Sequence, residues 1–502
     1  MNNLSETKNR KVIFYLLGFV AVTMLLRMVF TVTLPYTDTT EARYGATAQL
    51  MALTNDWITP WFEPGVPFWG KPPLSFWAQA ASFEALGITE FAGRLPSWLA
   101  TLGILILTYI AAQAAHAKTI RQPKSADVTP ALAVAILSTM VFTFVSAGTV
   151  MTDSFLVFGT TLTITSLIKI MTGSSKGWRW GFFVGIAIGL LAKGPITLVL
   201  CGFPILIWAI FKGNLLRLLK ALPWIRGSLL VALISFPWYV LAELKTPGFL
   251  DYFIVGEHFR RFVVPGWEGD LYGSAHDQPR GMIWYFLLLT GFPWIPLAII
   301  TVTARLFRRR KVIAETPTGQ SNLYTLIFLA GLTPAIFFSF AGNILPAYTL
   351  PGLPFLAILI ATLYTHTVTN RLGGLALTLA MLITPVMGLA AGTYFSINTD
   401  ELKTEGPALQ RLTSSDEVNF SDVTYIGDIK FSARFYSIEQ SRNISRNALN
   451  EMLANREQSL PKVLGVPRND TSLLAKLAGR SEPIDENLRY VFFSGDEVRA
   501  QD

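Results

Sequence analysis

Long apolar segments recur along most of this chain, and they restrict its fold more than any other feature. Runs of roughly 18 or more apolar residues, long enough to cross a bilayer as helices, follow one another between residues 12 and 394. Charged residues make up only 15% of the 502 residues, whereas soluble domains contain about a quarter. The pattern therefore predicts a polytopic α-helical membrane protein.

The positions of the apolar runs predict about 11–13 transmembrane helices. The short pair at 179–192 and 195–211 forms either two spans or one, and the sequence leaves this open. The clearest candidates are residues 12–34, 95–115, 129–149, 154–172, 179–192, 195–211, 227–243, 281–304, 321–340, 345–366 and 373–394.

Basic residues are concentrated in the short loops on one side of the predicted spans. Such loops normally face the cytoplasm, which places the N-terminus in the cytoplasm. The long loops 35–94 and 244–280 and the C-terminus then lie outside the cytoplasm. The basic residues on the cytoplasmic side are Lys118, Arg121, Lys124, Lys176, Arg179, Lys212, Arg217, Lys220, Arg226, Arg305 and residues 308–311.

The composition also excludes several classes of partner and site. The net charge is +8, but the membrane orientation explains this positive charge better than nucleic-acid binding does. The chain has one cysteine, Cys201, which excludes a disulfide framework or a cysteine metal cluster. The expected partners are therefore membrane lipids and their derivatives.

The composition becomes that of a soluble domain at about residue 398. We predict short buried strands at 423–427, 462–466 and 489–493, with helices at 447–456 and 471–478 between them. Roughly 100 residues are sufficient for a domain that folds by itself. The predicted organisation is a membrane domain at 1–397 and a small soluble extracytoplasmic α/β domain at 398–502.

The first long loop holds two acids and a lysine with chemical potential. Asp38 and Glu41 are three residues apart and share a face if this segment is helical. They are candidates for a general base or a cation site, or they are simply acids at a helix N-terminus. Lys71 precedes two prolines in Gly70-Lys71-Pro72-Pro73 and either binds a lipid phosphate or extends to the interface as an ordinary snorkelling lysine.

Further candidates come from later loops predicted on the same side. Asp153 lies in a short turn and is either a second active-site acid or a helix cap. Arg260 and Arg261 are suited to bidentate phosphate binding. Glu257 and His258 are candidate ligands for a divalent metal ion, although their spacing is not a specific metal motif.

These acids and cations all lie on one predicted side of the membrane. Carboxylates beside phosphate-binding cations at headgroup depth are typical of chemistry on a polyprenyl phosphate. The residues alone predict no particular sugar or acceptor.

Several motifs, taken as a set, make the membrane part similar to a known family. The chain resembles the bacterial relatives of protein O-mannosyltransferases, and particularly the lipid A aminoarabinose transferases, within the GT-C membrane glycosyltransferases. The motifs are Thr40-Glu41-Ala42-Arg43-Tyr44, Asp56-Trp57-Ile58-Thr59-Pro60, Gly70-Lys71-Pro72-Pro73-Leu74, Glu90-Phe91-Ala92-Gly93-Arg94-Leu95-Pro96-Ser97, Thr152-Asp153, Glu257-His258-Phe259-Arg260-Arg261-Phe262 and Leu345-Pro346-Ala347-Tyr348-Thr349-Leu350-Pro351.

This resemblance implies an inverting transfer of a sugar from a polyprenyl-phosphate carrier to lipid A, another envelope glycan or a protein. Asp38 or Glu41 would act as base with Asp153 in support, and Arg43, Lys71, Arg260 and Arg261 would bind the donor phosphate. Two positions depart from the family pattern. Thr40 and Gly70 stand where relatives commonly have acids, which leaves the identity of the base and of the sugar open.

Two other predictions complete the sequence reading. The predicted periplasmic position of the C-terminal domain suggests that it recognises the acceptor. The alternative function is a transporter or flippase of polyprenyl-linked sugars. Transporters commonly show repeated halves with polar residues near the membrane midplane, whereas the sequence shows no internal repeat and its charges, apart from Arg27, cluster at one face.

Overall fold

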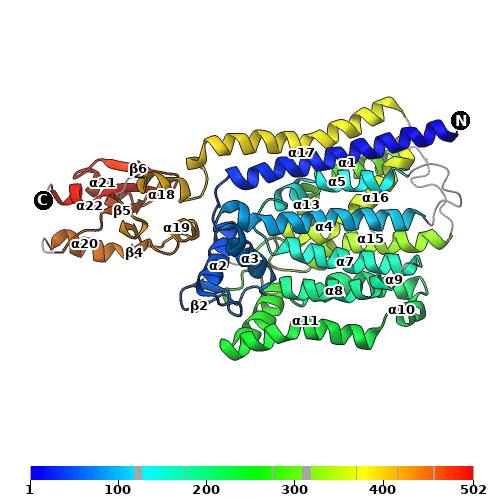
Figure 1. Cartoon of the computed structure of the whole chain (residues 1–502), viewed down its shortest axis with the longest axis horizontal. Helices are drawn as coiled ribbons and strands as arrows, with labels where there is room; N and C mark the ends of the chain where they lie inside the picture. The colour runs from blue at the N-terminus through cyan, green and yellow to red at the C-terminus, as the bar shows by residue number, and fades with distance from the viewer. Residues whose placement is uncertain are drawn as a thin grey trace.

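The computed structural model describes residues 2–117, 127–173, 176–273, 276–307, 318–368, 370–414, 417–455 and 458–500. The predicted loop residues Lys118, Arg121, Lys124 and 308–311, and residue 456 of a predicted helix, lie outside these residues. Figure 1 shows a bundle of long helices with the N-terminus at one end and the small C-terminal domain beyond the other.

Long helices of membrane-spanning character form the body of the molecule. Within the described residues, six helices are long and apolar enough to cross a membrane, or seven if one bent pair counts as a span. They confirm the predicted polytopic helical fold. The six are α1 (Asn2–Thr33), α4 (Glu90–Ala117), α7 (Asp153–Met171), α11 (Trp224–Lys245), α16 (Leu353–Thr367), which continues the 3-10 helix η2 (Pro346–Gly352), and α17 (Arg371–Ile397).

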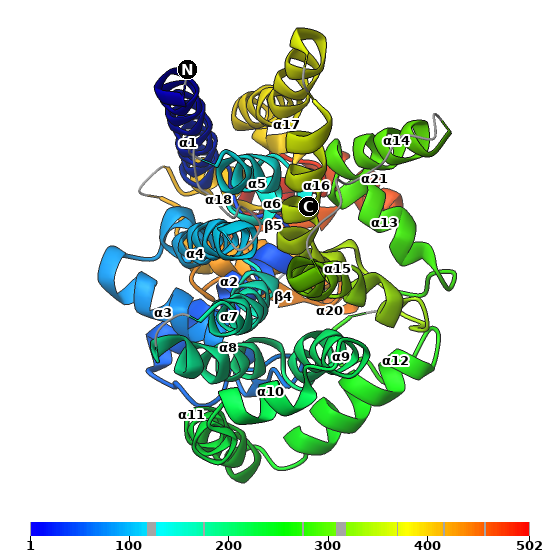
Figure 2. The same ribbon diagram turned by 90° about the vertical axis from the view of Figure 1, so that its right-hand side faces the viewer.

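The remaining apolar helices are shorter and lie among these spans. Figure 2, viewed along the bundle, shows α7 and α8 side by side, with α11 at the rim. The short predicted pair forms two separate helices, which turn at Gly194. These helices are α5 (Thr129–Ser138), α6 (Val141–Ser146), α8 (Gly177–Lys193), α9 (Ile196–Phe211), α10 (Leu215–Ala221) and α15 (Thr318–Phe338).

Two predicted spans are not continuous helices. The segment 281–304 forms α13 (Met282–Thr290) and α14 (Trp294–Phe307), which are bent by 103° at a break that contains Pro293. Proline cannot donate the hydrogen bond that would continue the helix. The segment 129–149 breaks between α5 and α6 at Thr139 and Met140.

Arg27 stabilises the C-terminal end of α6 from inside the bundle. It lies in α1 with 8% of its surface exposed. Its guanidinium donates to the carbonyl oxygens of Phe144 at 3.1 Å, Val145 at 3.1 Å and Gly148 at 2.7 Å. Carbonyl groups at a helix C-terminus have no partner within the helix, and the hydrocarbon core of a membrane offers no water to replace one. The buried Arg27 therefore has a structural role, because it supplies hydrogen bonds to these carbonyl groups.

The first long loop is folded onto one end of the bundle. It contains α2 (Thr40–Thr54), the hairpin of β1 (Trp61–Glu63) and β2 (Val66–Pro67), and α3 (Leu74–Leu86). Arg94, on α4, holds this loop through a buried bidentate pair with Glu41, at 2.7 and 2.8 Å. The same guanidinium donates to the carbonyl oxygens of Thr31 and Pro35, both at 3.1 Å.

The C-terminal domain is a five-stranded mixed sheet with helices, as the sequence predicted. The three predicted strands and two predicted helices are present to within about two residues, a normal uncertainty for element ends. The sheet order is β4-β3-β5-β7-β6, with β5–β7–β6 antiparallel and β4–β3–β5 parallel. Its elements are α18 (Gly406–Leu412), β3 (Val423–Ile426), α19 (Phe431–Tyr436), β4 (Arg442–Ile444), α20 (Arg446–Ala454), β5 (Val463–Pro467), α21 (Thr471–Ala478), β6 (Pro483–Glu486), β7 (Tyr490–Ser494) and α22 (Gly495–Ala500).

Helix α19 joins this domain to the first loop. The Phe435 ring packs on Tyr36, with the ring centroids 4.6 Å apart. The Tyr436 hydroxyl donates to Glu90 at 2.8 Å and accepts from the Tyr36 backbone at 2.7 Å. The C-terminal domain therefore contacts the loop that contains four of the nine candidate site residues.

The Arg94–Glu41 pair yields a stability prediction. Arg94→Met leaves a buried carboxylate without its partner, a change that costs about 3–5 kcal/mol of unfolding free energy. Arg94→Met combined with Glu41→Leu removes both charges, and we expect it to recover part of that loss. Thermal unfolding of the purified full-length protein measures both changes.

A matched control is the exposed pair of Arg10 and Glu6, 2.8 Å apart on α1. Arg10→Met should change the unfolding temperature little, because exposed pairs contribute weakly. A double variant no more stable than Arg94→Met alone would contradict the assigned role of the buried charge.

Candidate functional site

Two adjoining cavities lie where the loops meet the helix ends. One, here called the charged cavity, has a volume of about 510 Å³ and is lined by four cations and three carboxylates. The other, here called the apolar cavity, has a volume of about 190 Å³. Both are lined by Gly70, Lys71, Asp153, Lys193, Glu257, Arg261 and Tyr348.

Three separate elements bring together Lys71, Glu257 and Arg261. Lys71 lies in the turn between β2 and α3, which Pro72 and Pro73 stiffen because proline fixes its φ angle. Glu257 lies on the π-helix η1 (Asp251–Arg260), and Arg261 begins the following short helix α12 (Arg261–Val263). Asn343 anchors this second loop by donating to the carbonyl oxygens of Arg261 at 2.6 Å and Val264 at 2.9 Å.

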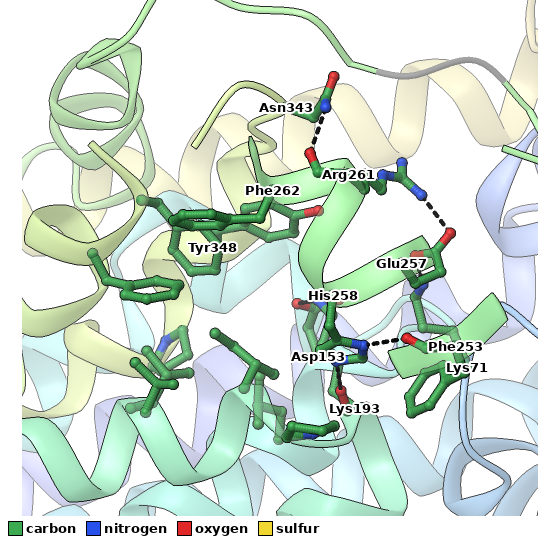
Figure 3. Close-up of a pocket in the computed structure, with 18 of the residues that line it drawn as sticks. Lys71, Asp153, Lys193, Phe253, Glu257, His258, Arg261, Phe262, Asn343 and Tyr348 are labelled. Atoms are coloured by element: carbon green, nitrogen blue, oxygen red, sulfur yellow. Dashed lines mark hydrogen bonds and ion pairs between the residues drawn. The ribbon is translucent and has the colours of Figure 1, made fainter. Parts of the chain in front are cut away.

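Glu257 is the centre of a buried ion cluster. Its carboxylate lies 3.3 Å from Lys71 Nζ and 2.8 Å from a terminal nitrogen of Arg261 (Figure 3), and its side chain is 7% exposed. Burial opposes the charge of this carboxyl, but Lys71 and Arg261 outweigh burial and lower the pKa of Glu257 to about 2. Burial also opposes the charge of Lys71, yet the Glu257 carboxylate raises the pKa of the lysine. The cluster is therefore fully ionised at neutral pH.

A second ion pair lies beside this cluster. Asp153 is the first residue of α7 and pairs with Lys193, the last residue of α8 (Figure 3). The Lys193 ammonium also lies 5.0 Å from the centre of the Tyr348 ring. Lys193 precedes the break at Gly194 and lines both cavities.

Arg43 and Arg261 each retain an unused hydrogen-bond donor. Arg43 lines the charged cavity from α2 and donates through a terminal nitrogen to the Tyr272 carbonyl at 2.6 Å. Within the described residues, the buried Nε atoms of Arg43 and Arg261 have no hydrogen-bond partner. Buried donors are normally satisfied, so neither guanidinium group is fully paired in the part of the chain that the structure describes.

The apolar cavity continues from the charged cluster between helices. Its remaining walls are mostly hydrocarbon and aromatic and come from α7, α9, α15 and the second loop. Examples are Leu156, Val199, Phe262 and Phe338. The combined space presents ionic groups at one end and apolar side chains at the other.

The structure brings six of the predicted site residues to these cavities. They are Arg43, Lys71, Asp153, Glu257, His258 and Arg261. Sequence reasoning did not single out Tyr348, except within a family motif, or Tyr272, which supports Arg43. An aromatic residue in an apolar chain carries no distinguishing signal before its neighbours are known.

Three predicted site residues do not line either cavity. Asp38 accepts hydrogen bonds from Ser432 and pairs with Arg489 of the C-terminal domain at 2.7 Å. Glu41 is held by Arg94, and the Val150 backbone also donates to it at 3.2 Å. Arg260, directly before Arg261, is exposed.

The metal-binding hypothesis receives no support from the residues it named. Both ring nitrogens of His258 lie near backbone oxygens, those of Phe253 at 2.7 Å and Lys193 at 3.1 Å. Glu257 is occupied by two cations. Across the described ranges, no group of three or more His, Cys, Asp or Glu side chains is arranged to hold a metal ion.

Comparison with known proteins supports the predicted family. The model of the dolichyl-phosphate-mannose-protein mannosyltransferase family matches residues 12–253. The undecaprenyl phosphate-alpha-4-amino-4-deoxy-L-arabinose arabinosyl transferase 1 of Pseudomonas fluorescens is 30% identical over 375 residues, or 71% of this chain and 61% of that protein. The corresponding transferase of Aeromonas hydrophila is 28% identical over 329 residues, or 64% of this chain and 54% of that protein. The alignments thus span less than two thirds of each relative.

A solved structure shows the same fold over nearly the whole chain. The crystal structure of ArnT from Cupriavidus metallidurans bound to undecaprenyl phosphate superposes with a TM-score of 0.71, at 15% identity, covering 96% of this chain and 98% of that one. The apo form of the same protein gives a TM-score of 0.69. The GT-C fold predicted from the first-loop motifs is therefore confirmed, and the chain is a relative of the ArnT-like GT-C glycosyltransferases.

Proposed function

We propose that this protein is an inverting glycosyltransferase that uses a polyprenyl-phosphate sugar donor. The acceptor is lipid A, another envelope glycan or a protein at the outer face of the inner membrane. The observation that carries this proposal is the charged cavity beside the apolar cavity, with seven lining residues in common. Four cations against three carboxylates leave an excess positive charge for an anionic head group, and the apolar walls suit a hydrocarbon tail.

The proposed reaction displaces the carrier phosphate from the sugar. An acceptor oxygen attacks C1 from the face opposite the phosphate and forms the new bond. The old bond between C1 and the phosphate oxygen breaks, and its electron pair remains on the phosphate. Lys71 and Arg261 would stabilise this developing charge from a buried site, where fixed cations act more strongly than in water.

Asp153 is our candidate for the general base. It is the one member of the predicted acid set Asp38, Glu41 and Asp153 that lines the charged cavity. A hydroxyl acceptor must lose a proton during the attack, and Asp153 would receive it while Lys193 holds the carboxylate in place. An acceptor phosphate is already deprotonated and would need only orientation.

The flippase alternative is less consistent with the distribution of charge. A transporter typically binds its substrate near the midplane, between repeated halves. The candidate site instead lies among residues from the first and second long loops and the helix ends. The Arg27 side chain within α1 is occupied by backbone carbonyls.

We also propose the orientation of the chain in the inner membrane. Lys212, Arg217, Lys220 and Arg226 lie around α10, at the end of the bundle away from the C-terminal domain (Figure 1). Positive loops are retained in the cytoplasm, so this end would be cytoplasmic, together with the N-terminus. The candidate site and the C-terminal domain would then be periplasmic.

Mass spectrometry of lipid A and other envelope glycans tests the proposed activity. A deletion strain should lose one defined sugar, and the wild-type gene should restore it. Lys71→Ala and Arg261→Ala should restore less than about 1% of it, because each removes a cation that stabilises the leaving phosphate. Arg260→Ala is the matched control, and we expect nearly full restoration because this neighbouring side chain is exposed.

The same experiment separates the competing outcomes. Equal restoration by Lys71→Ala, Arg261→Ala and wild type, at equal protein levels, would contradict the assigned site and favour the transporter.

Asp153→Asn tests the general base. With a hydroxyl acceptor, we expect kcat to fall by about 10²–10⁴-fold, the range for losing a positioned base. Binding of the lipid carrier should change much less, because Lys71 and Arg261 remain. Steady-state kinetics and carrier binding on the same preparation measure both quantities. Wild-type turnover by Asp153→Asn on a hydroxyl acceptor would exclude Asp153 as the base.

Cysteine labelling tests the proposed orientation. The native Cys201 is buried and is replaced by alanine. Glu482→Cys, on the exposed surface of the C-terminal domain, should react with a membrane-impermeant maleimide in spheroplasts. Lys220→Cys, on the exposed face of α10, should react only after the membrane is permeabilised. The reverse labelling pattern would show that the topology is the opposite of the one proposed.

A further inference from the structure

Glu257 occupies the position that an anionic ligand of this site would need. Its two carboxylate oxygens face Lys71 Nζ at 3.3 Å and an Arg261 nitrogen at 2.8 Å, and the Tyr252 hydroxyl donates to it at 3.3 Å. Carboxylate and phosphate oxygens accept the same charge-assisted hydrogen bonds from lysine and arginine. The chain therefore supplies its own anion to the two cations assigned to the donor phosphate.

Both cations of the cluster, Lys71 and Arg261, also have partners other than Glu257. Lys71 Nζ also donates to the Gly70 carbonyl oxygen. Arg261 also pairs with Asp270 at 3.2 Å. Both cations would therefore stay near the cavity if the Glu257 carboxylate moved away, and the Arg261 terminal nitrogen that now donates to Glu257 could donate to a phosphate oxygen.

Glu257 lies on an unusual backbone element. All ten residues of η1 form a π-helix, although π-helical turns mostly occur singly and often at functional sites. Asp251 on the first turn of the same helix is exposed, whereas Glu257 is turned into the cavity wall. Of these two acids on the same helix, only Glu257 therefore places its carboxylate in the cavity wall.

We propose that Glu257 is an internal substitute for the donor phosphate: it holds Lys71 and Arg261 in place in the empty site, yields them to the phosphate of the donor, and recaptures them to expel the polyprenyl-phosphate product. This inference rests on the proposed function, since it assigns a role in that same site. Glu257 is a positioning residue, because it acts on the phosphate through the two cations.

The charge of the carrier phosphate changes during the reaction, and this change decides which ligand Glu257 displaces more readily. The donor phosphate is a diester with one negative charge. When its bond to C1 breaks and the electron pair stays on oxygen, the product becomes a monoester with up to two negative charges. A nearby carboxylate repels the more highly charged product more strongly. Glu257 would therefore weaken product binding more than donor binding.

The test measures binding of undecaprenyl phosphate to the full-length protein in lipid nanodiscs. Glu257→Gln keeps the size of the side chain and removes its charge, so we expect the Kd to fall by at least about tenfold, as for the loss of one nearby like charge. Asp251→Asn removes an exposed carboxylate from the same helix and should leave the Kd within about twofold of wild type.

A second variant separates charge from packing. Glu257→Asp retains the carboxylate, and its Kd should stay within about threefold of wild type, because the cations still have an internal anion. We also expect undecaprenyl phosphate to raise the unfolding temperature of Glu257→Gln more than that of wild type, since the ligand then supplies the missing counter-charge.

Other outcomes overturn the inference in distinguishable ways. An unchanged or higher Kd for Glu257→Gln, with wild type binding normally, means that Glu257 only stabilises the fold. Equally tight binding by Glu257→Asp and Glu257→Gln means that packing, and not charge, sets the affinity. A wild-type protein that does not bind undecaprenyl phosphate overturns the proposed function together with this inference.

Discussion

The buried pair of Arg94 and Glu41 is the interaction on which the rest of the site depends. Arg94 connects α4, the end of α1 and the start of α2 through one guanidinium group, and Glu41 extends the connection to the Val150 backbone. A charged pair this deeply buried is a poor source of net stability compared with apolar packing, but it fixes geometry because each of its groups is held by several protein partners at once. Val150 lies three residues before Asp153, so this connection reaches the segment that leads into α7.

The sequence predicted which residues gather at the site better than it predicted the role of each residue. Apolar runs predicted the helical membrane fold, and short buried apolar segments predicted three strands of the C-terminal domain. Arg43, Lys71, Asp153, Glu257, His258 and Arg261 all line the cavities, because polar groups in an otherwise apolar chain tend to mark a site. The breaks at Pro293 and between α5 and α6 were missed, because hydropathy does not distinguish a bent apolar segment from a straight one.

The sequence predicted site roles for Asp38, Glu41 and Arg260, but none of them lines either cavity. For the two acids, the reason is a partner that is distant in the sequence. Asp38 meets Arg489, 451 positions away, and Glu41 meets Arg94, 53 positions away. No local pattern contains those pairings, and an isolated acid near a membrane surface is indistinguishable from a catalytic one. Arg260 and Arg261 are identical as residues, but successive side chains on a helix point in different directions, and here only Arg261 lines the cavities while Arg260 is exposed.

The departures at Thr40 and Gly70 acquire a physical meaning in this arrangement. Both residues line the charged cavity without adding negative charge to it. Its carboxylates are Asp153, Glu257 and Asp270, and each is paired with a lysine or arginine. A fourth or fifth acid would remove the excess positive charge or leave a carboxylate unpaired in a buried space, which is costly. With Thr40 and Gly70 in place, the cavity remains cationic, so the ligand that completes it must bring its own negative charge.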